Sequence, residues 1–258
     1  MKQHNVIVTG ASRGIGKAIA KQLINEGYNC VLVGRNQDQL NQAVADLESD
    51  HNIVFGLPCD VTDPEQINTM LATVAAELGH VDVLVNCAGR SGGGVTQNLS
   101  DELWLDVINT NLNSVFFMTR AVLASDLMKA GGSIINVAST GGKQGVVHGA
   151  PYSASKHGVV GFSKALGLEL ARAKADITVN AVCPGFVETE MAAQVRRNYA
   201  KIWDVSEEEA KSRIEARVPI GRYIEPDEVA AMVSYLASEK ARGVTAQALN
   251  VCGGLGNY

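Results

Sequence analysis

Short apolar runs alternate with longer amphipathic stretches along the chain, and this alternation predicts β-strands separated by helices. Near-continuous runs of valine, isoleucine and leucine are typical of parallel strands that are covered on both faces. We expect strands at residues 6–8, 30–33, 53–55, 83–85, 134–137, 178–182 and 248–251. The helical stretches between them indicate βαβ units, and therefore an α/β fold with a doubly wound parallel sheet of about seven strands.

The alternation of strands and helices is interrupted once, at about residues 186–222. That segment is helical in pattern and richer in charge than its surroundings, and we interpret it as a helical lid over a substrate site. No proline-rich or serine-rich linker, low-complexity tract or internal repeat divides the sequence. We therefore expect one domain over residues 1–258 with the lid inserted in it.

Composition narrows the functional classes. Hydrophobic residues make up 46% of the chain and charged residues 19%, which permits a large core and excludes global disorder. A net charge of −5 argues against a nucleic-acid partner. The sequence has no secretory leader pattern and no apolar run of ~18 residues, so we expect a cytoplasmic protein without a membrane span. Its cysteines and histidines lack ligand spacing, which predicts free thiols and no metal site.

A glycine-rich turn follows the first predicted strand and precedes a helix predicted over residues 17–26. It reads Thr9-Gly10-Ala11-Ser12-Arg13-Gly14-Ile15-Gly16. Glycines permit a tight turn and close approach of the backbone to a pyrophosphate, whose charge is met by the helix N-terminus. The strand before and the helix after this turn favour a dinucleotide site over a glycine loop without a ligand.

The end of the second strand distinguishes NAD from NADP. An NAD-preferring site needs an acidic residue there to bind the ribose 2′-hydroxyl. Here the strand ends in Val33-Gly34-Arg35. The guanidinium of Arg35, joined by that of Arg13, suits a 2′-phosphate, whereas the alternative for Arg35 alone is a solvated surface charge. We therefore predict NADP(H) as the cofactor.

The third and fourth strands also end in polar or small residues. Asp60, followed by Val61, either accepts a bond from the adenine amine or caps the helix that starts near Asp63. Ligands of open α/β sheets bind at this carboxyl edge, where the fourth strand ends in Asn86-Cys87-Ala88-Gly89. The loop of residues 90–94 borders any ligand in that crevice.

Tyr152 and Lys156 are four residues apart, directly after a proline that suits the first turn of a helix. At this spacing the ammonium can lie near the phenol and lower its pKa. Such a pair can transfer a proton to or from a substrate oxygen. The alternative for an isolated pair is a half-buried aromatic ring with a lysine stem beside it.

Two further polar residues each have two interpretations. Ser139 follows the fifth strand at the same sheet edge, where its hydroxyl either bonds a substrate carbonyl or caps the next turn. Asn111 lies within a helical run, where its side chain either satisfies a local backbone gap or holds a water that leads to Lys156.

Together these motifs, with Pro184-Gly185, resemble the short-chain dehydrogenase/reductase family over the whole chain. The resemblance implies a Rossmann fold with Tyr152 as acid/base. Lys156 then lowers its pKa and binds the nicotinamide ribose, while Ser139 orients the carbonyl and Asn111 holds a proton-relay water. The resemblance also implies a homotetramer in which helices near 101–129 and 151–173 pack across a dyad. The implied cofactor-binding residues are Thr9, Gly10, Ser12, Arg13, Gly14, Ile15, Gly16, Arg35, Asp60, Val61, Asn86, Ala88, Gly89, Tyr152, Lys156, Pro184, Gly185, Val187 and Thr189.

A closer resemblance lies outside the shared motifs. Residues 90–94, 139–145, 182–189, 217–223 and the tail 249–258 resemble the ketoreductases of aromatic (type II) polyketide synthases. Those enzymes reduce one ketone, typically at C9, of a poly-β-keto chain on acyl carrier protein. Ser91 occupies a position where those enzymes commonly have proline. This difference leaves the stereochemistry of the product open, whereas the implied reaction type is unchanged.

The lid is expected to serve this substrate. Its apolar residues either line a roomy cleft or pack as the core of the insertion. The substrate candidates are Ser91, Gly92, Gly93, Gln144, Val146, Met191, Tyr199 and Trp203. Lys and Arg outnumber Asp and Glu between residues 196 and 222, which suits an acidic carrier protein, although each arginine alone is more often a solvated charge. The docking candidates are Arg90, Arg196, Arg197, Arg217 and Arg222.

We therefore expect an NADPH-dependent ketoreductase acting on a carrier-bound polyketide. The alternatives are a 3-oxoacyl-acyl-carrier-protein reductase of fatty-acid synthesis and a non-catalytic NADP-binding scaffold.

Overall fold

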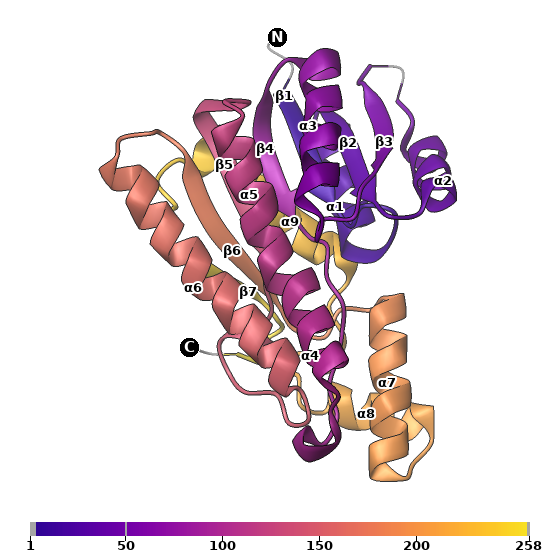
Figure 1. Ribbon diagram of the computed structural model, residues 1–258. Coiled ribbons are helices and arrows are strands. Elements are labelled where there is room, and N and C mark those ends of the chain that lie inside the picture. The colour runs from indigo at the N-terminus through magenta and orange to yellow at the C-terminus, as the bar shows by residue number, and fades with distance from the viewer. Residues whose placement is uncertain (1–3, 50, 257–258) are drawn as a thin grey trace.

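The computed structural model describes residues 4–49 and 51–256, and these residues form one parallel sheet with helices on both faces (Figure 1). The strand order is β3-β2-β1-β4-β5-β6-β7, and every neighbouring pair is parallel. The strands are β1 (His4–Thr9), β2 (Tyr28–Gly34), β3 (Val54–Pro58), β4 (Val81–Asn86), β5 (Met128–Val137), β6 (Thr178–Pro184) and β7 (Ala248–Val251). The predicted α/β fold with a seven-stranded parallel sheet is confirmed.

Successive side chains of a strand point to opposite faces of the sheet, and here both faces are apolar. Val6 and Val8 of β1 pack into one core and Ile7 into the other. In β4, Val83 and Val85 lie with the first pair and Leu84 with Ile7. This arrangement explains why the strands appear in the sequence as continuous apolar runs.

Two layers of helices cover the sheet. The first core contains side chains from α1 (Gly14–Asn25), α2 (Gln37–Leu47) and α9 (Pro226–Ala237). The second contains side chains from α3 (Pro64–Leu78), α5 (Ser114–Ala124) and α6 (Ala150–Arg172). Figure 1 shows α3, α5 and α6 side by side across the viewer's face of the sheet.

The long helix expected near residues 101–129 is interrupted. The structure has α4 (Asp101–Ile108), a π-helical turn (Asn109–Asn113) and then α5, which ends at Ala124. Residues 128 and 129 already belong to β5, so the expected end of that helix is wrong. The reason is that Met128 is buried in the sheet core and pairs with Val81 of β4.

The segment proposed as a lid carries α7 (Glu190–Trp203) and α8 (Glu207–Glu215). Figure 1 shows both helices projecting from the sheet beside α4. They have a small core of their own around Ala192, Ile214 and Tyr223. A bridge between Val187 and Ile224 joins the two ends of the segment at its base. The last two residues of the tail that carried the closer resemblance lie outside the described residues.

Candidate active site

The glycine-rich turn is built by close backbone contacts between the ends of β1 and β4. The Thr9 hydroxyl oxygen accepts bonds from the backbone N–H groups of Cys87 and Ala88, each 3.0 Å away. Gly10 has a φ of +66°, and a Cβ there would lie 2.9 Å from Cα of Ala88. A Cβ on Gly16 would lie 2.2 Å from the carbonyl oxygen of Gly10. Only glycine fits these positions, because any side chain would collide with the backbone of the turn or of β4.

The same turn meets the start of the lid. A Cβ on Gly14 would lie 3.6 Å from Cγ2 of Thr189, the residue that caps α7. Arg13 forms an exposed ion pair with Glu190 at 2.9 Å. Among the described residues no side chain caps α1, and uncapped amides at a helix N-terminus are suited to bind a phosphate. Ser12 lies in this turn close to Gly34, and Ile15 packs inward against the core.

The ends of β2 and β3 complete this edge. Arg35 follows β2 directly and is exposed. Asp60 uses one carboxylate oxygen to accept bonds from the backbone N–H and the hydroxyl of Thr62, at 2.9 and 2.7 Å. The N-cap of α3 is Asp63, whose side chain accepts from the backbone of Glu65 and Gln66. The interpretation of Asp60 as that cap is therefore wrong, because the helix starts three residues later than such a role requires. Val61 is buried beside it.

Ser139, Tyr152 and Lys156 come together at the carboxyl end of β5. Pro151 lies in the first turn of α6, so Tyr152 and Lys156 lie one turn apart on that helix. The Ser139 hydroxyl is hydrogen-bonded to the Tyr152 phenol and also accepts from the backbone N–H of Gly141 at 3.0 Å. Of its two alternatives, Ser139 caps the next turn, and its bond to a substrate carbonyl stays a prediction.

Burial shifts the pKa values of both Lys156 and Tyr152. It lowers the pKa of Lys156 to about 8, because the ammonium is withdrawn from water. Burial also raises the pKa of Tyr152, while the hydrogen bond from Ser139 acts in the opposite direction. The expectation that Lys156 holds the phenol's pKa below its usual range is not met in this structure. Its Nζ donates to the carbonyl oxygen of Val137 at 2.8 Å instead.

Asn111 lies in the π-helical turn and is fully buried. Its Oδ1 accepts from the backbone N–H of Arg90 at 2.8 Å, and its Nδ2 donates to the Arg90 carbonyl at 3.0 Å and to the Ser155 hydroxyl at 3.1 Å. The side chain therefore satisfies backbone hydrogen-bonding groups, as one of the two alternatives predicted. These groups belong to Arg90, however, which is distant in sequence and not local to the helix. A Cβ on Gly89 would lie 3.3 Å from Asn111 Oδ1 and 3.6 Å from Lys156 Nζ, so the Asn111 side chain lies close to Lys156. Asn86, at the end of β4, donates to Thr119 and Asn136 in the buried core.

The loop of residues 90–94 is held on two sides. A Cβ on Gly92 would lie 2.3 Å from Cγ2 of Val107 in α4, and one on Gly93 would lie 2.1 Å from the carbonyl oxygen of His148. The backbone N–H of Gly94 donates to that same oxygen at 2.7 Å. Ser91 is half-buried in this loop. Gln144 and Val146 follow β5 on the opposing loop, where the Val146 N–H donates to the Ser153 hydroxyl at 3.0 Å.

These features can be compared with known proteins. A family model described as "short chain dehydrogenase" matches residues 4–200. The chain belongs to the short-chain dehydrogenase family.

Several relatives cover nearly all of this dehydrogenase. It is 61% identical over 254 residues to the ketoacyl reductase 1 assigned to the granaticin polyketide synthase of Streptomyces violaceoruber, covering 98% of this chain and 93% of that one. It is 39% identical to the 3-oxoacyl-acyl-carrier-protein reductase of Escherichia coli, covering 96% of each. A crystal structure of an actinorhodin polyketide ketoreductase variant with NADPH superposes with a TM-score of 0.94 at 56% identity, covering 99% of this chain and 98% of that one.

The end of β6 forms one more wall of the dehydrogenase's site. Gly185 donates its backbone N–H to the carbonyl of Val251, and a Cβ there would lie 3.0 Å from Cβ of Cys252. Pro184 and Val187 are buried on either side of it. The predicted segment from Pro184 to Thr189 therefore runs from the sheet edge to the lid.

Two substrate candidates of the lid lie in its own core. Tyr199 and Trp203 stack on each other with ring centres 4.6 Å apart and pack around Ile214 and Tyr223. For these two residues the structure favours packing within the insertion over lining a cleft. Met191 is 41% exposed on α7.

The docking candidates differ in accessibility. Arg196 is bonded to Glu188 at 2.7 Å and lies over the Tyr223 ring at 5.3 Å, with 15% of its side chain exposed. A docking role for Arg196 is therefore contradicted, because its guanidinium is part of the lid interior. Arg197 and Arg217 are exposed. The other two candidates are paired with acids: Arg90 with Asp106, and Arg222 with Glu228.

Sequence reasoning missed two residues near the group formed by Ser139, Tyr152 and Lys156. Ser155 is fully buried and bonds Asn111. Lys143, in the loop after Ser139, donates from Nζ to Oδ1 of Asn250 at 2.9 Å and so links that loop to the C-terminal tail. Both lie inside segments that carried the resemblance, but a serine in a helix and a lysine in a loop have no distinguishing pattern of their own.

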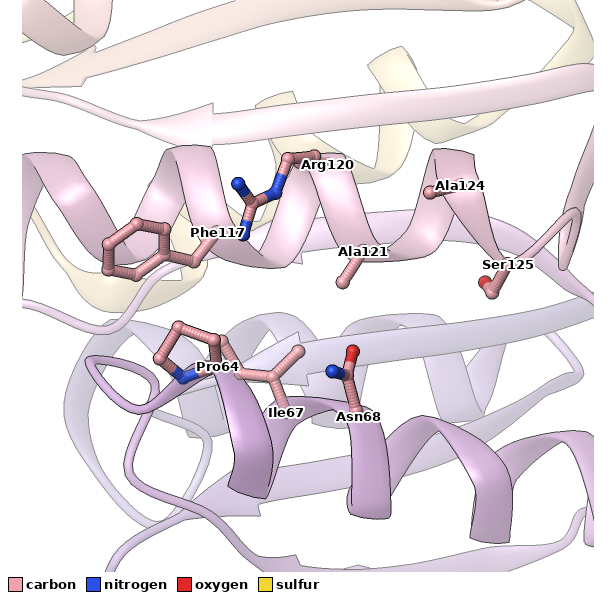
Figure 2. Close-up of a pocket in the computed structure, with 8 residues that line it drawn as sticks. All are labelled: Pro64, Ile67, Asn68, Phe117, Arg120, Ala121, Ala124 and Ser125. Atoms are coloured by element: carbon pink, nitrogen blue, oxygen red, sulfur yellow. The ribbon is translucent and has the colours of Figure 1, made fainter.

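A cavity of about 370 Å³ lies elsewhere, between α3 and α5 (Figure 2). It is lined by Pro64, Ile67, Asn68, Phe117, Arg120, Ala121, Ala124 and Ser125, none of which is a predicted site residue. Within residues 4–49 and 51–256, no group of three or more His, Cys, Asp or Glu side chains is arranged to hold a metal ion. Nor is any helix in that part of the chain both long and apolar enough to cross a membrane.

Proposed function

We propose that this dehydrogenase is an NADPH-dependent ketoreductase that reduces one ketone, at C9, of a carrier-protein-bound poly-β-keto chain in aromatic polyketide synthesis. The observation that carries the proposal is the grouping of Ser139, Tyr152 and Lys156 at the dinucleotide edge of the sheet. The relatives support the substrate class. Identity is 61% to the granaticin reductase but 39% to the fatty-acid reductase of Escherichia coli.

The residues at the sheet edge fit a phosphorylated dinucleotide. Gly10 and Gly16 permit the tight turn of a pyrophosphate site, because a side chain at either position would collide with backbone. Arg13 and Arg35 are exposed at the tips of the first turn and of β2, where a 2′-phosphate of NADP would bind. When bound, NADPH supplies a hydride from C4 of its nicotinamide to the carbonyl carbon.

The protein's own residues handle the oxygen and its proton. The hydroxyl groups of Ser139 and Tyr152 face each other, so a ketone oxygen placed between them accepts a hydrogen bond from each. Tyr152 keeps its proton at neutral pH because burial raises its pKa, and it donates that proton as negative charge develops on the oxygen. Lys156 supplies positive charge beside the phenol while it remains protonated.

The chain also carries surfaces suited to assembly and docking. Leu105, Phe116 and Leu168 are exposed apolar side chains on α4, α5 and α6, which supports the proposed packing of these helices across a dyad in a cytoplasmic homotetramer. Arg90, Arg197, Arg217 and Arg222 remain docking candidates for an acidic carrier protein.

The test compares substrates. NADPH oxidation is measured with a bicyclic ketone, with a linear 3-oxoacyl thioester and without substrate. Faster turnover of the bicyclic ketone supports the polyketide assignment, whereas preference for the linear thioester favours fatty-acid reduction. No turnover of either, with NADPH bound, favours a non-catalytic scaffold. Product analysis after reconstitution with a synthase and its carrier protein then tests the C9 position.

A further inference from the structure

A buried serine connects the substrate loop to the catalytic tyrosine. Ser155 lies on α6 between Tyr152 and Lys156 and has 0% exposure. Its hydroxyl donates to the backbone carbonyl of Tyr152 at 2.7 Å and accepts from Nδ2 of Asn111 at 3.1 Å. The Ser155 hydroxyl is thus bonded both to the helical turn that carries the phenol and to Asn111, which binds the Arg90 backbone.

The connection is continuous from loop to phenol. Asn111 binds both the N–H and the carbonyl of Arg90, which fixes the start of the loop at residues 90–94. Asn111 then bonds Ser155, and Ser155 bonds the Tyr152 carbonyl. Each of these polar groups has its partner inside the protein, so breaking one bond leaves a buried group without a partner. One chain of hydrogen bonds therefore links the loop to the helical turn that carries the phenol.

We propose that Ser155 is a positioning residue that fixes the position of Tyr152 relative to the 90–94 loop. The proposal rests on the assignment of Tyr152 as proton donor. A ketone must meet the phenol and the loop at the same time, and displacement of a reacting group by ~1 Å can lower the rate by up to about 100-fold. Loss of the Ser155 hydroxyl uncouples the two surfaces without removing any group that contacts the substrate.

The same helix provides a matched control. Ser163 is also fully buried on α6, donates to a backbone carbonyl of its own helix, that of Val159, at 2.7 Å, and accepts from an asparagine Nδ2, that of Asn136, at 2.8 Å. The two serines share burial, helix and hydrogen-bond pattern. They differ in that only Ser155 is bonded to Tyr152 and Asn111. A purely structural role predicts the same effect for both.

The experiment compares Ser155→Ala with Ser163→Ala. We expect similar losses of melting temperature and unchanged NADPH dissociation constants in both variants. In Ser155→Ala we expect kcat to fall about tenfold or more and the primary deuterium isotope effect from C4-deuterated NADPH to rise, because hydride transfer becomes rate-limiting. Ser163→Ala should keep kcat within about twofold and an unchanged isotope effect.

Equal kcat and isotope effects in the two variants would overturn the proposal. If Ser155→Ala fails to fold, Ser155→Cys replaces it, because a thiol has similar size but is a weak donor, and the same comparison applies. Ser155→Thr retains the hydroxyl and should recover kcat; a folded Thr variant as slow as the Ala variant would also contradict the proposal. Tyr152→Phe is run in parallel: if it stays active, the assignment of Tyr152 fails rather than the coupling by Ser155.

Discussion

The Nζ atom of Lys156 lies 6.0 Å from the centre of the Tyr152 ring and donates its hydrogen bond to the carbonyl of Val137. The lysine is thus anchored to the end of β5 and not to the phenol. Burial disfavours the charged form of both the Lys156 ammonium and the Tyr152 phenol. These shifts keep the phenol protonated at neutral pH and make the charge of Lys156 sensitive to pH.

Replacing Tyr152 with phenylalanine should remove the proton donor while keeping the ring. We expect turnover to fall by about 100-fold or more, because a positioned general acid contributes roughly 10²–10⁴-fold. NADPH affinity should change little, since the ring still packs on α6. Steady-state NADPH oxidation and fluorescence titration of the cofactor measure the two effects. Activity within a few-fold of wild type would rule out Tyr152 as the donor.

The pKa of Lys156 predicts two effects of pH. Its folded-state pKa of about 8 lies below its ordinary value of 10.5, so between these values the unfolded chain binds more protons. The contribution of Lys156 to the free energy of unfolding should therefore rise with pH over this window, by up to ~3 kcal/mol. Turnover should fall above about pH 8 if the ammonium is required.

Lys156→Met isolates this contribution to stability. The free energy of unfolding of wild type relative to the variant should rise with pH, as measured by urea unfolding at pH 7.5, 8.5 and 9.5. The buried thiols Cys30, Cys59 and Cys87, whose pKa values are raised, titrate in both proteins and cancel in this difference. Wild type and variant with parallel pH curves would show that Lys156 is not the titrating group.

The sequence was sufficient to predict the sheet because buried parallel strands are apolar on both faces, as Val6, Ile7 and Val8 are. It was less informative where tertiary contacts decide a role. Arg196 belongs to a charged stretch of the sequence, yet it stacks inside the lid on Tyr223. Tertiary packing also decides whether the pKa of Tyr152 is raised or lowered. Helical spacing predicts that Lys156 lies near the phenol, but it does not predict how deeply the two groups are buried.

Arg35 should determine the preference for NADPH over NADH. We expect Arg35→Asp to raise the dissociation constant of NADPH by about 10- to 100-fold, because a charge-assisted bond is worth ~1.5–3 kcal/mol and is replaced here by repulsion. The constant for NADH should change little. Arg172→Asp, at the far end of α6, makes the same charge change as a control. An equal loss for both cofactors would contradict the phosphate assignment.

The exposed arginines of the lid predict a salt-dependent effect on carrier-bound substrate alone. Arg217→Glu should raise KM for a carrier-protein thioester several-fold at low salt, with less effect at high salt, because surface charges are screened. KM for a free bicyclic ketone should not change. Arg172→Glu again controls for net charge. Equal KM values for wild type and Arg217→Glu on the carrier-bound substrate would exclude this residue from docking.

Two glycines, one in the 90–94 loop and one in the opposing loop, offer a test of how closely the 90–94 loop packs against His148. A Cβ on Gly93 would lie 2.1 Å from the backbone oxygen of His148, whereas a Cβ on Gly145 would meet nothing within 4 Å. Backbone cannot yield as a flexible side chain does, so Gly93→Ala must displace the loop. We expect it to lower turnover about tenfold or more and to reduce thermal stability, whereas Gly145→Ala should change neither appreciably. Melting curves and kcat/KM for a bicyclic ketone measure both effects. Because the two substitutions add the same methyl group, a Gly93→Ala variant as active and stable as Gly145→Ala would show that the loop does not rest against His148.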